Sequence, residues 1–257
     1  MASSDERERR AQDRITQQIS RRFERRMRTE LSQAIRDAAD AHESGRSIDA
    51  AVATHNDNVD RLLRGMWEAS FTAIGERVLS QLDDEERGLP WTGEVKQLPD
   101  AIQRALSSFI GRWGARKVTQ ITSATQSWIR SAIERGVEEG LSVPDIGASI
   151  RSRAIQIAAW RANTIARTET HSAAQNGSLQ VAMDSGKVRL KRWVPVQDGR
   201  TRRGDNSDFD HANPDRGEVP VNEPFVISGE ELMHPGDPSA SAGNIVNCRC
   251  AMVYRTR

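Results

Sequence analysis

The sequence is poor in cysteine and in aromatic residues. Cys248 and Cys250 are the only cysteines among 257 residues, and one residue separates them. A disulfide between such close neighbours is strained, so the pair is not the disulfide framework of a small secreted domain. Aromatic side chains make up 5% of the chain and charged ones 28%, a polar composition that favours helices over a dense β-sandwich.

The sequence also lacks a long apolar run and an excess of charge of either sign. No apolar stretch approaches the ~20 residues that a membrane span requires, so we expect no membrane partner. No apolar segment follows the opening MASSDERERR, so we expect no signal peptide and a protein made and kept in a cytoplasm or in an assembly formed there. Lys and Arg total 37 against 36 for Asp and Glu, so the net charge of +1 attracts neither nucleic acid nor membrane.

What the chain has in quantity is helical periodicity. Apolar side chains recur in steps of three and four over most of the first 183 residues, which predicts a series of amphipathic helices. A segment rich in proline, glycine and charge, residues 83–100, predicts a loop or joint between them. The expected helices are residues 5–42 with a stop at Gly45, 48–83, 101–140, a helix capped by Ser142, and 158–183.

After Gly186 the periodicity changes to that of strands and turns. VRLKRWVPV predicts a strand, which Pro195 confines to a sheet edge or a strand end. Residues 200–244 consist almost entirely of residue types that favour turns. In residues 246–255 successive side chains alternate between two faces as in a strand, with both cysteines on one face. We therefore predict a predominantly α-helical α+β protein. Its expected parts are an N-terminal helical region (1–90), a central helical region (91–186) and a small turn-rich C-terminal module with a few strands (187–257).

The last long helix has a face of small side chains that would allow another backbone to approach closely. Glu169 lies on this face, and an unpaired buried carboxylate there would be costly. We expect Arg200, Arg202 or Arg249 to pair with Glu169 and so fasten the helix to the C-terminal module. The small-face residues are Ala162, Ile165, Ala166, Ala173 and Gly177.

Four stretches, in order between residues 101 and 253, carry a family resemblance. They are FIGRWGARKVTQITSATQSWIRSAIERGVEEGLSVPDIGASIRSR, IARTETHSAAQNGSLQVAMDSG, KRWVPVQDGRTR and HPGDPSASAGNIVNCRCAMV. Together they resemble the phage Mu F-like minor head (head-morphogenesis) proteins of tailed phages and prophages. The chain lacks the cysteine pair that one common family variant carries after the Asp198 turn. The motif residues are Arg167, Thr168, Glu169, Asp198, Arg200, Thr201, Arg202, His234, Pro235, Cys248, Arg249 and Cys250.

The resemblance implies a non-enzymatic minor capsid protein that assists head assembly and DNA packaging or release. Its implied partners are the portal protein, the major capsid or scaffold protein and, non-specifically, viral DNA. Its implied location is the capsid interior near the portal, with a stay in the host cytoplasm during assembly. The alternative is a metal-dependent nuclease or a DNA-binding protein that acts during packaging.

A zinc site is one chemical interpretation of the C-terminal module. Two thiols and two imidazoles, from His211, His234, Cys248 and Cys250, are a ligand set that zinc accepts. Structural zinc favours Cys-x2-4-Cys, however, and alternation gives the cysteines a plain role as core thiols beside Met252 and Tyr254. The sequence favours the second interpretation, and we expect no cofactor.

Two further interpretations concern DNA. Asp210, His211 and Pro214 resemble the start of a His-Asn-His nuclease, but the metal-bearing residue after Cys250 is missing. Clustered cations around the predicted strand could bind the DNA backbone without sequence preference, while a solvated basic edge explains them equally well. These cations are Arg189, Lys191, Arg192, Arg200, Arg202 and Arg203.

Overall fold

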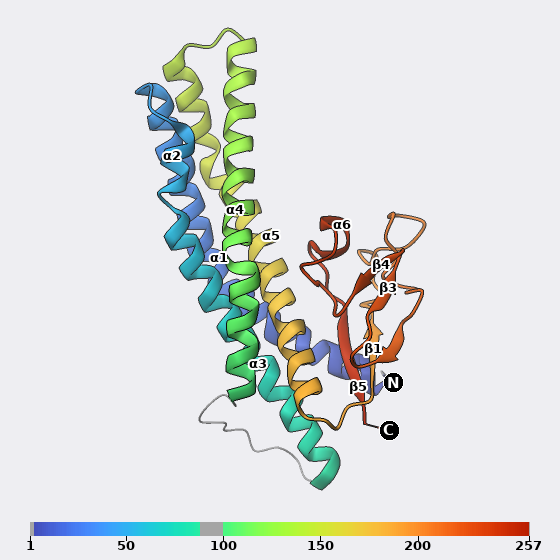
Figure 1. The fold of residues 1–257 in the computed structure, drawn as a ribbon. Coiled ribbons are helices and arrows are strands. Elements are labelled where there is room, and N and C mark those ends of the chain that lie inside the picture. Colours follow the sequence, from blue (N-terminus) through green and yellow to red (C-terminus); the bar gives the residue numbers. More distant parts are fainter. Residues whose placement is uncertain (1–2, 88–99, 257) are drawn as a thin grey trace. The chain divides into compact units, whose positions relative to one another are not determined.

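The computed structural model describes residues 3–87 and 100–256, which form long helices followed by short antiparallel strands (Figure 1). The predominantly helical α+β class predicted from the sequence is confirmed. Residues 88–99, most of the predicted joint, lie outside the described residues. The helices are α1 (Ser4–Glu43), α2 (Ile48–Ala53), α3 (Asn56–Arg87), α4 (Asp100–Glu138), α5 (Val143–Asp184) and α6 (Ala242–Ile245).

Two helix ends follow the predicted signals. α1 stops before Gly45, whose φ of +67° allows the Arg46 N–H to donate to the Ala41 carbonyl at 2.8 Å and so satisfy one of the last carbonyls. At the start of α5 the Ser142 hydroxyl accepts from the Asp145 N–H at 3.3 Å, as an N-cap does.

Two other boundaries differ from the prediction. The helix expected over residues 48–83 is interrupted at Thr54 and His55, where the His55 imidazole contacts the carboxylates of Glu30 and Asp37 at 2.5 and 2.9 Å. A long-range contact outweighs local propensity there. Conversely, the two helices expected from Ser142 to residue 183 are one helix, since no glycine or proline interrupts residues 148–158.

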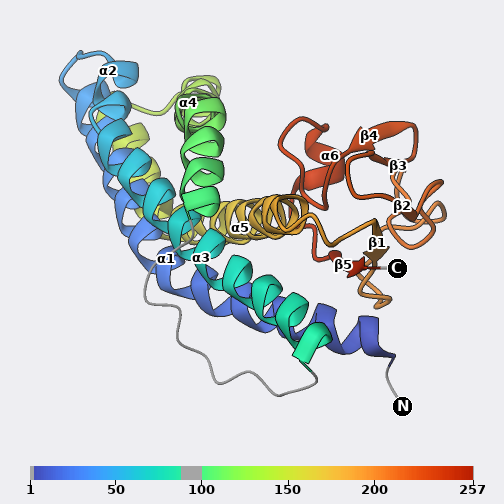
Figure 2. The same cartoon turned by 60° about the horizontal axis from the view of Figure 1, so that its bottom comes forward.

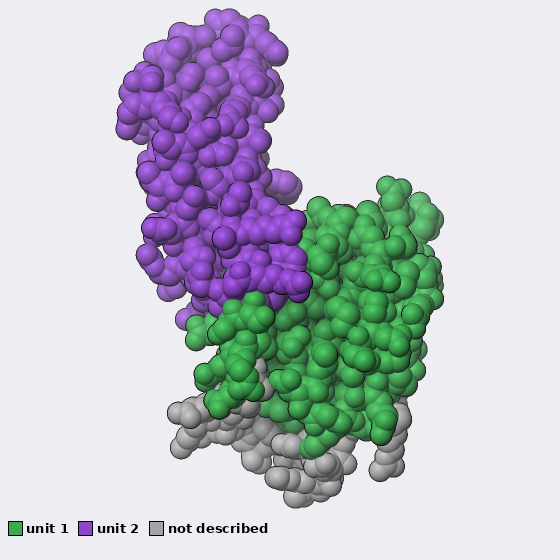
Figure 3. Space-filling model, viewed as in Figure 1, with its two compact units in different colours: residues 1–19, 66–108, 167–257 green, residues 20–65, 109–166 purple. Residues whose placement is uncertain are grey.

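The chain forms two compact units that do not follow chain order (Figure 3). Unit 1 comprises residues 1–19, 66–108 and 167–257, and unit 2 comprises residues 20–65 and 109–166. Unit 2 is helical and buries Met27, Ile35 and Ile129. Unit 1 combines helical segments with all five strands. The three-part division expected from the sequence stays a prediction.

Within unit 1 the small-residue face of α5 packs tightly against α3. A Cβ atom placed on Gly177 would lie 3.1 Å from the Cα atom of Phe71. Ala173 is fully buried on the same face, and Glu169 is 5% exposed. The close backbone approach expected of this face is confirmed at Gly177.

The strands of unit 1 form two small antiparallel sheets beyond the end of α5 (Figure 2). β1 (Leu190–Val194) lies between β2 (Glu218–Pro220) and β5 (Ala251–Arg255), with Trp193 opposite Met252. β3 (Phe225–Ile227) pairs with β4 (Glu230–Leu232) through a turn in which Ser228 and Gly229 both have positive φ. β1 ends just before Pro195, as predicted.

The sequence missed β2, β3 and β4, which lie inside the stretch expected to be turns. Each has three residues, too few for an alternating pattern to stand out. The closing strand is also shorter than expected, because β5 begins only at Ala251. Its two faces are both buried at Ala251 to Val253, and Gln12 of α1 donates to the Met252 carbonyl at 3.0 Å.

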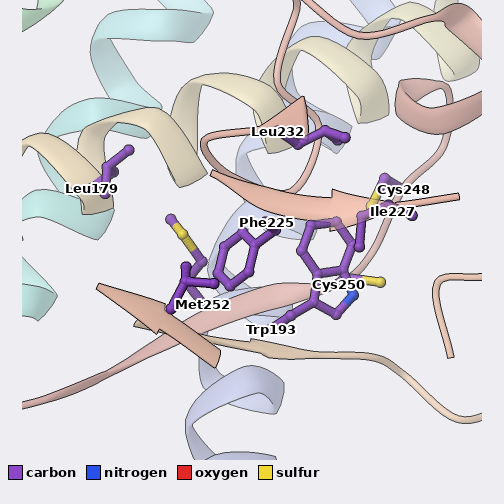
Figure 4. Close-up of a cluster of buried hydrophobic side chains, with 9 residues drawn as sticks. Leu179, Trp193, Phe225, Ile227, Leu232, Cys248, Cys250 and Met252 are labelled. Atoms are coloured by element: carbon purple, nitrogen blue, oxygen red, sulfur yellow. The ribbon is translucent and has the colours of Figure 1, made fainter. Parts of the chain in front are cut away.

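A core of nine buried side chains joins the two sheets to the end of α5 (Figure 4). Trp193 and Phe225 meet edge to face with ring centroids 5.4 Å apart. Both cysteines belong to this core. Its members are Leu179, Trp193, Val219, Phe225, Ile227, Leu232, Cys248, Cys250 and Met252.

Candidate functional site

Trp193 positions a buried polar cluster of the C-terminal module. Its indole N–H donates to the His211 carbonyl at 3.1 Å, and its ring lies edge-on to the imidazole with centroids 5.4 Å apart. The β1 strand thereby fixes a histidine that lies in a segment without regular structure. His211 is only 2% exposed.

A chain of hydrogen bonds determines which nitrogen of His211 carries the proton. Hydrogen bonds from Asn244 and Ser241 hold the pKa of the Glu230 carboxyl below its ordinary value, so this group acts as an acceptor. The Asn244 amide N–H donates to Glu230 at 2.9 Å, which turns the Asn244 oxygen toward His211 Nε2, also at 2.9 Å. Nε2 is therefore the donor, and Nδ1 of the neutral ring carries the free lone pair.

Nδ1 of His211 faces both cysteines. It lies 3.6 Å from the Sγ atom of Cys248 and 3.6 Å from that of Cys250. Both thiols are buried, and in Figure 4 Cys250 lies beside the Trp193 ring while Cys248 lies next to Ile227. Burial raises the pKa of the Cys250 thiol, while the neighbouring side chains of Cys250, His171 and His211 hold the pKa of the Cys248 thiol below its ordinary value.

A second histidine, His171 of α5, reaches the same cluster. It is 7% exposed, and it is one of the side chains that hold the pKa of the Cys248 thiol below its ordinary value. Among the described residues its Nε2 atom has no hydrogen-bond partner. Gly236, at φ +73°, packs against the ring, since a Cβ atom there would lie 2.9 Å from His171 Cδ2. Sequence reasoning missed this histidine because only the path of the loop brings it near the cysteines.

The four residues of the zinc interpretation, which the sequence did not favour, do not all come together. In the part of the chain that the structure describes, the ligand atoms of His211, Cys248 and Cys250 lie within 4.8 Å of one another, and His234 is not among them. His234 uses both ring nitrogens elsewhere, with the Pro235 carbonyl and the Asn176 amide each at 3.1 Å. The predicted set is corrected at His234, whose own loop and neighbour Asn176 occupy its ring.

The Asp198 turn and the Cys-Arg-Cys segment are tied together by a bidentate ion pair. Both guanidinium Nη atoms of Arg249 lie 2.7 Å from the Asp198 carboxylate oxygens. The Asp198 carboxylate also accepts from the Arg200 N–H and the Thr201 hydroxyl. Chiefly through Arg249, the pKa of the Asp198 carboxyl is held well below its ordinary value.

Two other motif residues, Arg202 and Thr168, form hydrogen bonds with the backbone near the Cys-Arg-Cys segment. Arg202 donates to the Val246 carbonyl, and the Thr168 hydroxyl accepts from the N–H of Asn247, whose φ is +56°. Arg200 is exposed, with its guanidinium 3.8 Å from Asp198. Arg167 and Glu169 lie on α5, and the pairing of Glu169 with an arginine stays a prediction.

The two DNA-directed interpretations lose part of their basis. Lys191 is fully buried, donates to the Met233 carbonyl at 2.7 Å and lies over the Phe225 ring, so it is not a surface cation. Arg202 is likewise turned inward to a backbone carbonyl. His211, the nuclease general base of the alternative, is buried away from solvent, and Asp210 caps its own turn by accepting from the N–H groups of Ala212 and Asn213.

Comparisons with known proteins agree with the motifs. Residues 127–253, which include the Asp198 turn, His211 and both cysteines, match the family model described as Phage Mu protein F like protein. The chain is 24% identical over 189 residues to a Bacillus subtilis (strain 168) protein named "Uncharacterized protein YqbB", an alignment that covers 72% of this chain and 60% of that protein. No solved structure matches the chain. Through residues 127–253 the chain belongs to the phage Mu F-like family of head-morphogenesis proteins.

Proposed function

We propose that this protein is a minor head protein that joins the procapsid, associates with the portal, and assists head assembly and DNA packaging or release. The family match over residues 127–253 carries the proposal. The burial of the motif residues supports a structural role, since His211 and both cysteines lie in a packed core rather than open to a substrate. The residues described include no helix that is long and apolar enough to cross a membrane.

Exposed apolar side chains in unit 2 support a protein partner. Of the six large hydrophobic side chains that are exposed among the described residues, five lie between residues 137 and 160. Trp160 and Ile155 of α5 are 70% and 59% exposed. Tryptophan is enriched at the energetic centres of protein interfaces, and its truncation there commonly costs ≥2 kcal/mol of binding free energy. We therefore assign the portal or procapsid contact to this part of unit 2.

Co-assembly tests the proposal. The full chain would be co-expressed with the portal, scaffold and major capsid proteins of its own phage, and procapsids would be isolated by sedimentation. We expect the chain in procapsids and in complex with purified portal. Trp160→Ala should reduce that binding by at least about tenfold, while Met183→Ala, at an exposed apolar position in unit 1, should leave it unchanged.

Two results would contradict the proposal. One is absence of the chain from procapsids and from portal complexes. The other is DNA nicking by the purified chain that disappears in His211→Ala, which would favour the nuclease alternative. Equal portal binding by the Trp160→Ala and wild-type proteins would leave the head-protein role standing but would remove the assigned surface.

A further inference from the structure

We propose that Cys248, Cys250 and His211 bind a structural zinc ion and that His171, rather than His234, is its fourth ligand. All four residues belong to unit 1. The site would be closed, with four protein ligands and no position open for water or substrate, as structural zinc sites are. It would fasten α5, the Cys-Arg-Cys segment and the loop of His211 to one another.

The spacing of the three ligand atoms already suits zinc. Tetrahedral bonds of about 2.3 Å to sulfur and about 2.05 Å to nitrogen place a sulfur and a nitrogen ligand about 3.6 Å apart. The distances from His211 Nδ1 to the two Sγ atoms are 3.6 and 3.6 Å. These two nitrogen-to-sulfur distances therefore need little change when zinc binds.

His211 is oriented as metal-binding histidines are. Such a histidine usually donates its other ring N–H to an oxygen that fixes its tautomer. Here Nε2–H donates to the Asn244 oxygen, and Asn244 is itself held by Glu230. The lone pair of Nδ1 is thereby fixed toward the two sulfurs.

Hydrogen bonds alone do not satisfy the cluster. Nδ1 offers one lone pair to two thiol donors, so only one thiol can use it fully. His171 Nε2 is buried and without a hydrogen-bond partner among the described residues, an arrangement that destabilises the folded protein. Zinc would take up both thiolates and both lone pairs. The two negative charges would cancel the ion's two positive charges, which suits a core formed by Trp193, Phe225 and Met252.

His171 is a better fourth ligand than His234. Like His234, it lies outside the group of three residues whose ligand atoms are within 4.8 Å of one another, but its Nε2 atom has no hydrogen bond among the described residues to break before it turns toward the ion. His234 would first have to break hydrogen bonds at both of its nitrogens. The two histidines are both buried and come from adjoining parts of unit 1, so each serves as a control for the other.

Metal analysis of the full chain is the first test. Protein purified from zinc-supplemented cells should carry about one zinc per chain by native mass spectrometry and elemental analysis. After exchange with cobalt, its visible spectrum should show thiolate-to-cobalt charge transfer and tetrahedral d–d bands. Zinc-free protein that stays metal-free in the presence of zinc, or that prefers another metal, overturns the proposal whatever any variant does.

Matched variants then test the ligand set. His171→Gln should lower zinc affinity by more than about tenfold and alter the cobalt d–d bands, while His234→Gln should bind as the wild type does. Asn244→Ala should lower the affinity by about 10–100-fold yet keep the wild-type cobalt spectrum, since it only orients His211. Circular dichroism checks that each variant is folded. Loss of binding in His234→Gln but not in His171→Gln would overturn the assignment of the fourth ligand.

Discussion

The ion pair between Asp198 and Arg249 should contribute measurably to the stability of the C-terminal module. It is bidentate, with both distances at 2.7 Å, and the side chains are 36% and 16% exposed. An exposed pair contributes about 0–1 kcal/mol, whereas a hydrogen bond to a charged group contributes about 1.5–3 kcal/mol when it is shielded from water. For this half-buried pair we expect a coupling free energy of about 1–2 kcal/mol.

A double-mutant cycle isolates that energy. Asp198→Asn removes the charge but keeps a side-chain oxygen for the Arg200 N–H and Thr201, and Arg249→Lys keeps the charge but loses the planar fork. Because the chain has two units, global unfolding is a poor readout. Hydrogen exchange of peptides from β1 and β5 reports the local stability instead.

The same pair predicts a pH dependence of definite sign. The pKa of the Asp198 carboxyl is depressed in the folded protein, so the unfolded chain binds the proton more readily. The contribution of the pair is therefore complete above the ordinary Asp range, about pH 4–5, and is lost as the pH falls further. Asp198→Asn should show no such loss at this site.

A control pair and a clear refutation complete the test. Arg216 and Glu223 form a single contact at 2.9 Å with side chains that are 52% and 47% exposed, so Arg216→Lys should change exchange by less than about 0.5 kcal/mol. A coupling below about 0.5 kcal/mol for Asp198 and Arg249 would refute the reasoning. It would mean that other contacts hold the Cys-Arg-Cys segment in place.

Two further predictions concern glycine packing and a buried lysine. Gly177→Ala should destabilise unit 1 by about 1–3 kcal/mol, because the added methyl group would overpack against α3. Gly111→Ala is the control: its methyl group would have nothing within 4 Å, so it should stabilise its helix by up to about 1 kcal/mol. Local hydrogen exchange measures both changes. Burial lowers the pKa of Lys191 to about 8 from 10.5, so the folded protein releases this proton before the unfolded chain does. The stability of the wild type relative to Lys191→Met should rise by about 2 kcal/mol between pH 8 and 10, and equal pH slopes in the local stability of β1, measured by hydrogen exchange, would contradict it.

The helices could be predicted because their signal is long and repeated. α1 spans 40 residues, and many periods of apolar residues fix its existence whatever it packs against. The break before α3 could not be predicted, because it coincides with contacts from His55 to carboxylates far away in α1. The three-residue strands β2, β3 and β4 could not be predicted because, unlike the helices, they are too short to show a repeated pattern. Their pairing is set by the Ser228–Gly229 turn and by neighbours, and three residues carry no period of their own.

The sequence predicts that the two cysteines lie together at the candidate site, but it does not predict which histidines lie next to them. Cys248 and Cys250 share a side of the chain because any extended segment alternates, whether or not it belongs to a sheet. Which imidazole meets them depends on where α5 and two irregular loops place His171, His211 and His234. No local pattern encodes that choice. The zinc interpretation includes His234 together with His211, but the loop of His234 and Asn176 occupy its ring.

The alternation of the Cys-Arg-Cys segment connects the ion pair to the buried thiols. Because side chains alternate along the segment, the two sulfurs face His211 and Arg249 faces the opposite side, where it forms its ion pair with Asp198. Asn247, at positive φ and bonded to Thr168 of α5, fixes where the segment begins. Contacts with His211, Asp198 and Thr168 thus hold both faces of the segment and its beginning. None of these contacts requires a substrate, so this part of the family signature can be maintained by packing and hydrogen bonding alone.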